Sequence, residues 1–182
     1  MKKIFLLLFC ILSQVDILGQ SFGLKSNFLY DGVGPNLGVE VALSQRLTLD
    51  LNANYNPFSV SETKKWKHLL IQPELRYWLC QPFSGHFIGA HLFEGEYNIG
   101  GINVADLKTR RIQGNVWGGG VSYGHHWILS PRWGVEASVG LGVARFHYGK
   151  YICAHCGYKT GTYNKTYLGP TKLSVSLVYL LK

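Results

Sequence analysis

The residues best suited to chemistry form a Cys-x-x-Cys motif, Cys153 and Cys156, in a long segment between two predicted strands. In an exported protein such a pair can close a local disulfide, exchange disulfides or, with two more ligands, bind zinc. His147 and His155 could supply those ligands, but His155 stands between the cysteines, where reaching the same ion is awkward. No thioredoxin-like pattern surrounds the motif. A loop-stiffening disulfide is favoured over zinc, and no metal or cofactor is predicted.

Two further groups of residues could carry catalysis. Ser122 and His126 share one face of a predicted strand, as in a lipid hydrolase, but four residues separate them by about 13 Å, too far for a hydrogen bond. His125 would lie on the other face. Glu74 and Glu136 could act as an acid–base pair, yet nothing in the sequence fixes their separation. We therefore expect no enzyme activity, and an enzyme that modifies outer-membrane lipid stays the alternative.

The elements that must position these residues are strands, because apolar residues recur at every second position. The pattern is clearest over Trp133–Phe146 and Thr171–Leu181. Strands of about 11 to 14 residues exceed the usual length of about 5 to 6 and match the roughly 9 to 11 needed to cross a bilayer. In the stretch 86–97 the apolar residues do not keep to one face of the strand, so we expect a bulge or an irregular register there. Eight strands are predicted, at about 22–30, 36–44, 47–56, 67–79, 86–97, 113–129, 132–146 and 169–181.

The chain begins with the features of an export signal. Lys2 and Lys3 precede an apolar run from Ile4 to Leu12, and a small residue at Gly19 offers a cleavage site. No small residue precedes Cys10, so simple cleavage is favoured over lipidation. We predict a signal peptide over residues 1–19 and a single domain over residues 20–182.

Composition favours a membrane location over a nucleic-acid partner. Charged residues make up 15% of the chain, against about 25% in ordinary soluble domains. The chain also has 22 glycines and 14% aromatic residues. The net charge of +8 would suit nucleic acid, but such a binder would not need export. Few charges with many glycines and aromatics fit a β-protein with one face in lipid.

Three features distinguish a membrane barrel from a soluble lipocalin-like barrel. In the soluble barrel the apolar face would point into the core and the polar face to water, whereas in the membrane barrel the apolar face points to lipid. Short turns alternate with longer loops. The polar face is rich in Gly, Ser and Ala, which a crowded eight-stranded interior needs. Aromatic residues gather near the strand ends, as in interfacial girdles. The predicted fold is all-β: an eight-stranded antiparallel up-and-down transmembrane β-barrel of the outer-membrane type, located in the cell outer membrane.

On this interpretation, charged residues of both signs point into the barrel. Pairing and hydrogen bonding would offset their desolvation. A lumen plugged by ion pairs is favoured, because eight strands leave an interior that side chains just fill, and a small ion-selective channel is the alternative. The predicted lumen charge network consists of Lys25, Glu40, Asp50, Glu74, Arg76, Glu136 and Lys172.

The predicted outer loops are basic. Cations near the phosphates of lipopolysaccharide are favourable, so outer-membrane lipid and lipopolysaccharide are the predicted partners, and a plain solvated loop is the open alternative. No nucleic-acid partner is predicted. The residues singled out are Lys64, Lys65, Lys67, Lys108, Arg110 and Arg111.

Several stretches together resemble a known family. They include Tyr30-Asp31 with Gly34–Glu40, Asn54–Phe58, Lys64–His68, Gln72–Cys80, Cys153–Gly157 and Gly169–Lys172. The chain resembles a domain-of-unknown-function family of small outer-membrane β-barrel proteins of Bacteroides-type bacteria, some of them encoded beside fimbrial genes. The resemblance implies a link to fimbriae or to another surface protein, and it carries over no catalytic residues. The expected function is that of a non-enzymatic barrel supporting surface assembly or binding through its basic outer loops.

Overall fold

The described residues fold into eight antiparallel strands and one short helix. The structure, a computed structural model, describes residues 22–31, 34–57, 65–101, 111–152 and 158–181. This confirms the predicted eight antiparallel strands, while the predicted signal peptide lies outside the described residues. The elements are β1 (Phe22–Asn27), α2 (Phe28–Asp31), β2 (Asn36–Ala42), β3 (Leu47–Asn56), β4 (Lys65–Trp78), β5 (Gly85–Gly100), β6 (Arg111–Ile128), β7 (Trp133–Tyr151) and β8 (Lys159–Leu181).

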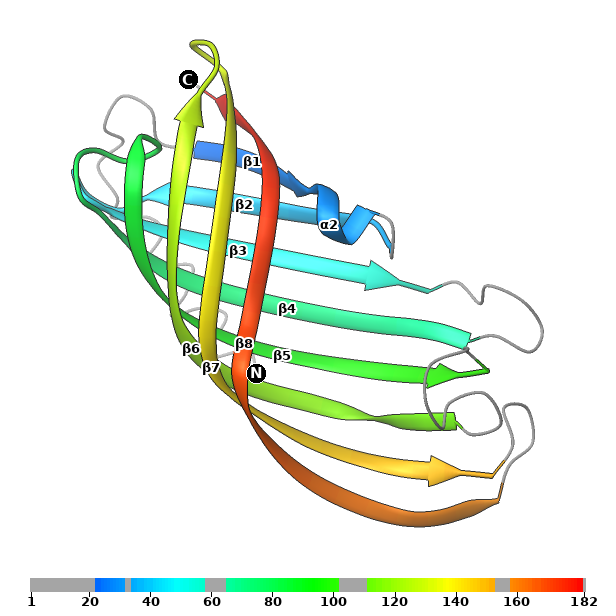
Figure 1. Cartoon of the computed structure of the whole chain (residues 1–182). Coiled ribbons are helices and arrows are strands. Elements are labelled where there is room, and N and C mark those ends of the chain that lie inside the picture. Colours follow the sequence, from blue (N-terminus) through cyan, green and yellow to red (C-terminus); the bar gives the residue numbers. More distant parts are fainter. Residues whose placement is uncertain (1–21, 32–33, 58–64, 102–110, 153–157, 182) are drawn as a thin grey trace, which may run out of the picture.

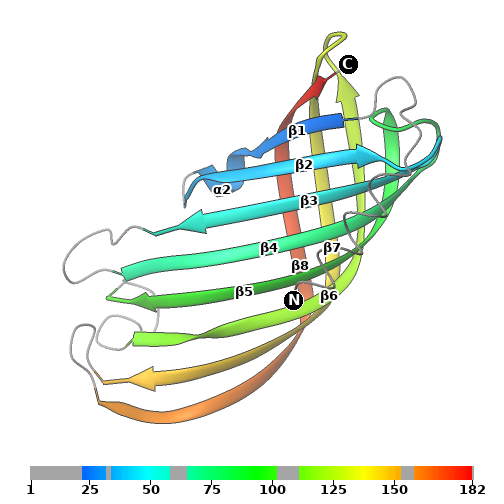
Figure 2. The ribbon, with the colours of Figure 1, turned by 180° about the vertical axis from the view of Figure 1, so that it is seen from behind.

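The strands form one sheet that closes on itself. Each strand pairs with the next along the chain, and β8 pairs with β1, so the order around the closed barrel follows the sequence. Figures 1 and 2 show this ring from opposite sides. Tight turns at 43–46, 79–84 and 129–132 join strands at one end, which we call the turn end. Among the described residues, no helix has the length and apolar character that a membrane crossing requires.

The ring is complete only near the turn end. β1 pairs with β8 from Ser176 to Leu181, and the chain then leaves the sheet as α2. The side chain of Asn27 holds this corner, because its Oδ1 accepts a hydrogen bond of 3.2 Å from the Val175 amide. Beyond it the other strands continue as an open curved sheet (Figures 1 and 2). We call this part the far half; it comprises residues 54–56, 65–71, 94–100, 111–117, 145–151 and 159–167.

Several strands are longer than the sequence predicts. The predicted loop between residues 146 and 169 is mostly strand, since β7 runs to Tyr151 and β8 begins at Lys159. Aromatic contacts help to explain the extension: the rings of Tyr148 and Tyr163 stack with centroids 5.8 Å apart. β1 is shorter than predicted because residues 28–31 form α2.

The predicted bulge in the fifth strand is wrong. β5 keeps an unbroken register with β6, and its residues alternate regularly between buried and exposed. Aromatic side chains of β5 point inward, where they meet glycines of β6 instead of side chains. A Cβ added at Gly124 would overlap Phe87, so large residues on one strand are matched by missing side chains on the next. Register shifts lie instead between β7 and β8, at Gly140/Leu141 and at Lys150/Tyr151.

Aromatic and aliphatic side chains close the ring at the turn end. The Trp78 ring packs against Phe87, with centroids 4.9 Å apart, and against Phe83 at 6.1 Å. Val178 and Leu180 of β8 are buried beside Phe83. Phe83 has a positive φ of 60°, an uncommon backbone conformation for a bulky residue, and its burial compensates for that strain. The charged residues inside the ring lie next to this apolar layer.

Candidate functional site: a buried charge cluster and an exposed far half

The structure brings the seven predicted lumen charges together in one cluster inside the ring. All seven are buried, with 6% exposure at most. They come from six of the eight strands, and three cations face four carboxylates. The members are Lys25 of β1, Glu40 of β2, Asp50 of β3, Glu74 and Arg76 of β4, Glu136 of β7 and Lys172 of β8.

Arg76 is the centre of the cluster. Its Nη1 lies 2.9 Å from Glu40 Oε2 and 3.0 Å from Glu136 Oε2. Its Nη2 lies 2.6 Å from Asp50 Oδ2, and its Nε lies 2.7 Å from Glu74 Oε2. The guanidinium also stands over the Phe87 ring, with Cζ 4.5 Å from the centroid. One cation therefore ties three neighbouring strands and β7 together, which suits the rigid fork of arginine.

The two lysines pair with carboxylates that Arg76 also contacts. Lys25 Nζ lies 2.8 Å from Glu136 Oε2 and also contacts Glu40. Lys172 Nζ pairs with Glu74, which also accepts a hydrogen bond from Ser122. Buried charges are tolerated when they are paired and hydrogen-bonded in this way.

The interior next to the cluster is almost filled. A cavity of about 30 Å³ lies on the far side of the cluster, which is room for about one water molecule. Amide side chains surround it, among them Asn27, Asn52, Asn54 and Gln72. Tyr30 also lines this cavity from α2 and so is not part of an outward girdle, although the strand pattern predicts it there.

The geometry around Ser122 does not form a serine–histidine pair. The Ser122 hydroxyl donates to Glu74, whereas Nδ1 of His126 lies 3.8 Å from Glu136 Oε2. His125 lies on the outward face, where its ring contacts His86 with centroids 4.1 Å apart. In the described ranges no group of three or more His, Cys, Asp or Glu side chains is placed to hold a metal ion.

The outward face of the ring carries a continuous apolar belt. Cross-strand pairing places Leu49, Leu75, Val121 and Leu141 on one row that runs across β3 to β7. Their side chains are exposed, to 63% for Val121 and 58% for Leu141. A patch of this extent on a monomer marks a surface meant for a partner or for lipid.

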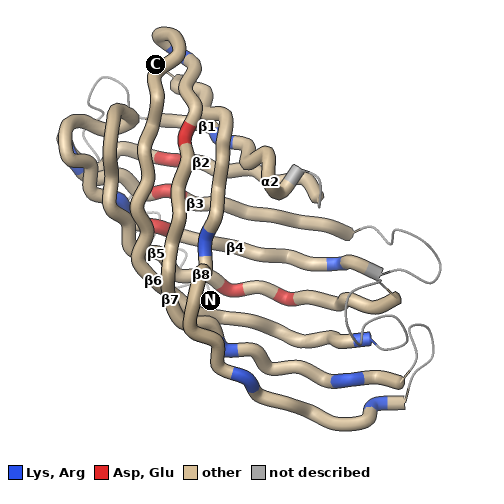
Figure 3. Tube along the Cα trace, viewed as in Figure 1, with Lys and Arg blue, Asp and Glu red and all other residues tan. Residues whose placement is uncertain are grey.

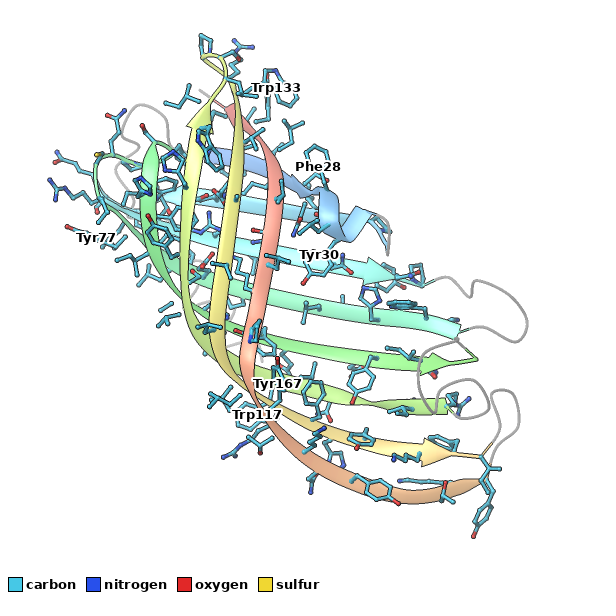
Figure 4. The ribbon with its side chains drawn as sticks, viewed as in Figure 1. Phe28, Tyr30, Tyr77, Trp117, Trp133 and Tyr167 are labelled. Atoms are coloured by element: carbon cyan, nitrogen blue, oxygen red, sulfur yellow. The ribbon has the colours of Figure 1, made fainter. Side chains whose placement is uncertain are left out.

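Aromatic residues border this belt at both margins. Tyr77 and Trp133 lie near the turn end, whereas Trp117 lies midway along its strand (Figure 4). On β6 the two borders are Trp117 and Trp127, both exposed. Ten residues at about 3.3 Å each, on a strand tilted by about 40°, span about 25 Å, the height of the apolar band in outer-membrane barrels.

The outward face becomes polar at the row of Glu94, Trp117 and Arg145, which are neighbours in register. Beyond this row the exposed outward residues of the far half include Glu96, Gln113, Asn115, His147 and Asn164. The change occurs on β5 to β8 and marks a boundary there between two environments, whereas Ile71 and Leu69 of β4, the register partners of Glu94 and Glu96, stay apolar and exposed.

The inward face of the far half has the opposite character, because aromatic and aliphatic residues line a groove there. Tyr97 and Phe146 make an edge-to-face contact with centroids 6.3 Å apart. Lys150 Nζ stands 5.1 Å from the centroid of Tyr163. The groove is lined by Tyr97, Ile99, Ile112, Phe146, Tyr148, Lys165, Tyr167 and Pro170.

The predicted loop residues are only partly placed. Lys67 is exposed on β4, and Arg111 begins β6 with its guanidinium 4.5 Å from the ring centroid of Tyr151. These two therefore stand on strands, not in loops, because the strands extend further than predicted. Lys65 begins β4. The predicted residues that lie outside the described ranges are Lys64, Lys108, Arg110, Cys153, His155 and Cys156.

The sequence pattern does not predict the far half as a surface. Its signal was present in β8, where Tyr163, Lys165 and Tyr167 alternate with smaller polar residues. A period of two indicates a strand even without aliphatic residues, but tyrosine and lysine within a Gly- and Thr-rich stretch also suit a loop.

A family comparison covers the ring and the far half together. The family described as "Protein of unknown function (DUF3575)" matches residues 4–181. The chain belongs to this family. The DUF3575 match agrees with the predicted domain of unknown function, and it spans every described strand. Neither a curated protein nor a solved structure matches the chain.

Proposed function

We propose that this DUF3575 protein is a non-enzymatic β-barrel of the bacterial outer membrane that presents its far half to a partner at the cell surface. The observation that carries the proposal is the outward face: an apolar belt of about 25 Å, bordered by aromatic residues, gives way to polar residues at the Trp117 row. A soluble barrel would have no reason to expose such a belt to water.

The charge cluster favours a closed barrel rather than a channel. Arg76 and its four carboxylates occupy the interior at the level of the belt. The cavity beside them, about 30 Å³, is too small for a hydrated ion to pass. The cluster then serves as a plug that fixes the strands relative to one another.

The length of the strands supports a surface role. β8 has 23 residues, or about 75 Å of extended chain, of which a tilted crossing uses roughly 9 to 11 residues. The far half therefore stands outside the bilayer, where its aromatic groove and its cations meet the surroundings. In this position the far half would meet lipopolysaccharide phosphates and surface proteins, such as a fimbrial subunit.

Cysteine labelling tests the proposed orientation. Cys80 is free and exposed at the turn end, and Thr162 is exposed in the far half. In chains with Cys153→Ser and Cys156→Ser, we expect a membrane-impermeant maleimide to label Thr162→Cys in intact cells. Cys80 should react only after the outer membrane is permeabilised. Labelling of Cys80 alone in intact cells would reverse the orientation, and labelling of neither would contradict a surface position.

A further inference from the structure

We infer that the edge of β8 in the far half accepts an extended, carboxylate-bearing segment of another protein as an additional strand. We call residues 159–167 the edge segment. The inference rests on the proposed function, because it needs the far half to be accessible at the cell surface. It adds the mode of binding and the chemistry of the partner.

The edge segment is paired on one side only, as far as the described chain extends. Its residues pair with β7, from Tyr151 opposite Lys159 to Ala144 opposite Tyr167. β1 reaches β8 only at residues 176–181, and the Asn27 corner ends at Val175. All residues of the edge segment except Gly161 are exposed. A row of backbone N–H and C=O groups therefore points away from the sheet, which is a template for a further strand.

Side chains beside this edge select for acidic partners. Lys165 lies on the inward face between Tyr163 and Tyr167, and Lys150 lies on the same face of β7. Figure 3 shows lysine and arginine residues along the far parts of β7 and β8. A strand added to β8 would place its side chains about 4.5 to 5.5 Å from those of the edge segment. Carboxylates opposite Lys165 would then form cross-strand ion pairs.

A second copy of this chain fits the edge poorly. Lysine on an exposed edge is a common device against self-association, and Lys159 and Lys165 would repel their counterparts in another copy. β8 edges could also pair in antiparallel fashion only if the two barrels pointed in opposite directions, which one membrane does not allow. The same lysines favour a partner with carboxylates. The edge segment therefore disfavours pairing with a second copy of the chain and favours an acidic segment.

Three synthetic peptides test the inference on the full chain held in detergent micelles. The first alternates Glu and Thr, so that an added strand presents all its carboxylates on one face. The second alternates Lys and Thr. The third repeats the first but is N-methylated at every backbone nitrogen, which removes the donors that strand pairing needs. Binding is measured by fluorescence anisotropy, and amide hydrogen exchange locates the site.

We expect the Glu–Thr peptide alone to bind and to slow amide exchange in the edge segment. Lys165→Glu should weaken this binding by about tenfold. The matched control is Arg145→Glu, which changes the net charge equally but lies on the outward face of β7, and it should leave binding nearly unchanged.

Equal effects of the two variants, or binding of the methylated peptide, would overturn the inference in favour of general charge attraction. Failure of the Glu–Thr peptide to bind would also overturn it. If the Glu–Thr peptide does not bind but Thr162→Cys is labelled in intact cells, the inference fails and the proposed function stands. Peptide binding without labelling of Thr162→Cys would support strand addition at the edge segment and contradict the position of the far half at the cell surface.

Discussion

Replacing Arg76 with leucine is expected to destabilise the folded chain by about 3 to 5 kcal/mol, the usual cost of removing one partner from a buried ion pair. Arg76 contacts Glu40, Asp50, Glu74 and Glu136, and the two lysines cannot replace all of these contacts. Leucine would leave four buried carboxylates with only two lysines as partners. The free energy of unfolding is measured by urea titration in lipid vesicles, with tryptophan fluorescence as the signal.

Arg46→Leu is the control for this variant. Arg46 lies exposed in a turn, and its Nη1 donates a hydrogen bond of 3.2 Å to the Tyr77 hydroxyl. Its loss should cost less than about 1 kcal/mol. If Arg76→Leu prevents folding altogether, Arg76→Lys, which keeps the charge but not the fork, should fold with intermediate stability. Equal unfolding free energies for Arg76→Leu and Arg46→Leu would refute the assigned role of the cluster.

The second large effect is expected on the apolar belt. Val121→Arg should lower the free energy of unfolding by about 2 to 4 kcal/mol in lipid vesicles, because it places a cation at the middle of the bilayer. Val121 lies near the midpoint between Trp117 and Trp127 and is 63% exposed. On a water-facing surface the same change would fall within about 0.5 kcal/mol of zero.

Gln113→Arg is the matched control on the same strand. Gln113 is exposed, points outward like Val121, and lies beyond the row at which the outward face turns polar. Its replacement should change the unfolding free energy little in the same titration. A cost for Gln113→Arg as large as that for Val121→Arg would mean that the two positions share one environment, which the proposal excludes.

The closed ring could be predicted from the sequence because its residues alternate strictly. Apolar residues such as Val139 and Leu141 stand between glycines and serines, so both the strand and its two faces are evident. The inward charges follow from the same period. Their partners could not be predicted, because contacts such as that between Arg76 and Glu136 depend on the closure of the ring.

The far half escaped prediction for a physical reason. Its outward face on β5 to β8 is polar, so the contrast that identifies a strand near lipid is lost in residues such as Thr162 and Asn164. Tyrosines on the inward face carry the remaining signal. The sequence of the fifth strand falsely suggests a bulge for a related reason, because its inward face holds Phe87 and Phe93 while Glu94 and Glu96 face outward beyond the belt. Apolar inward and acidic outward residues blur the expected pattern.

Refolding from urea, with and without lipid vesicles, tests the membrane barrel most directly. The apolar belt should require a bilayer, because in buffer alone its leucines and valines would face water. We expect the chain to fold only in the presence of vesicles and to migrate differently on gels with and without boiling. Folding to the same state in lipid-free buffer, with a mobility that boiling does not change, would contradict the account.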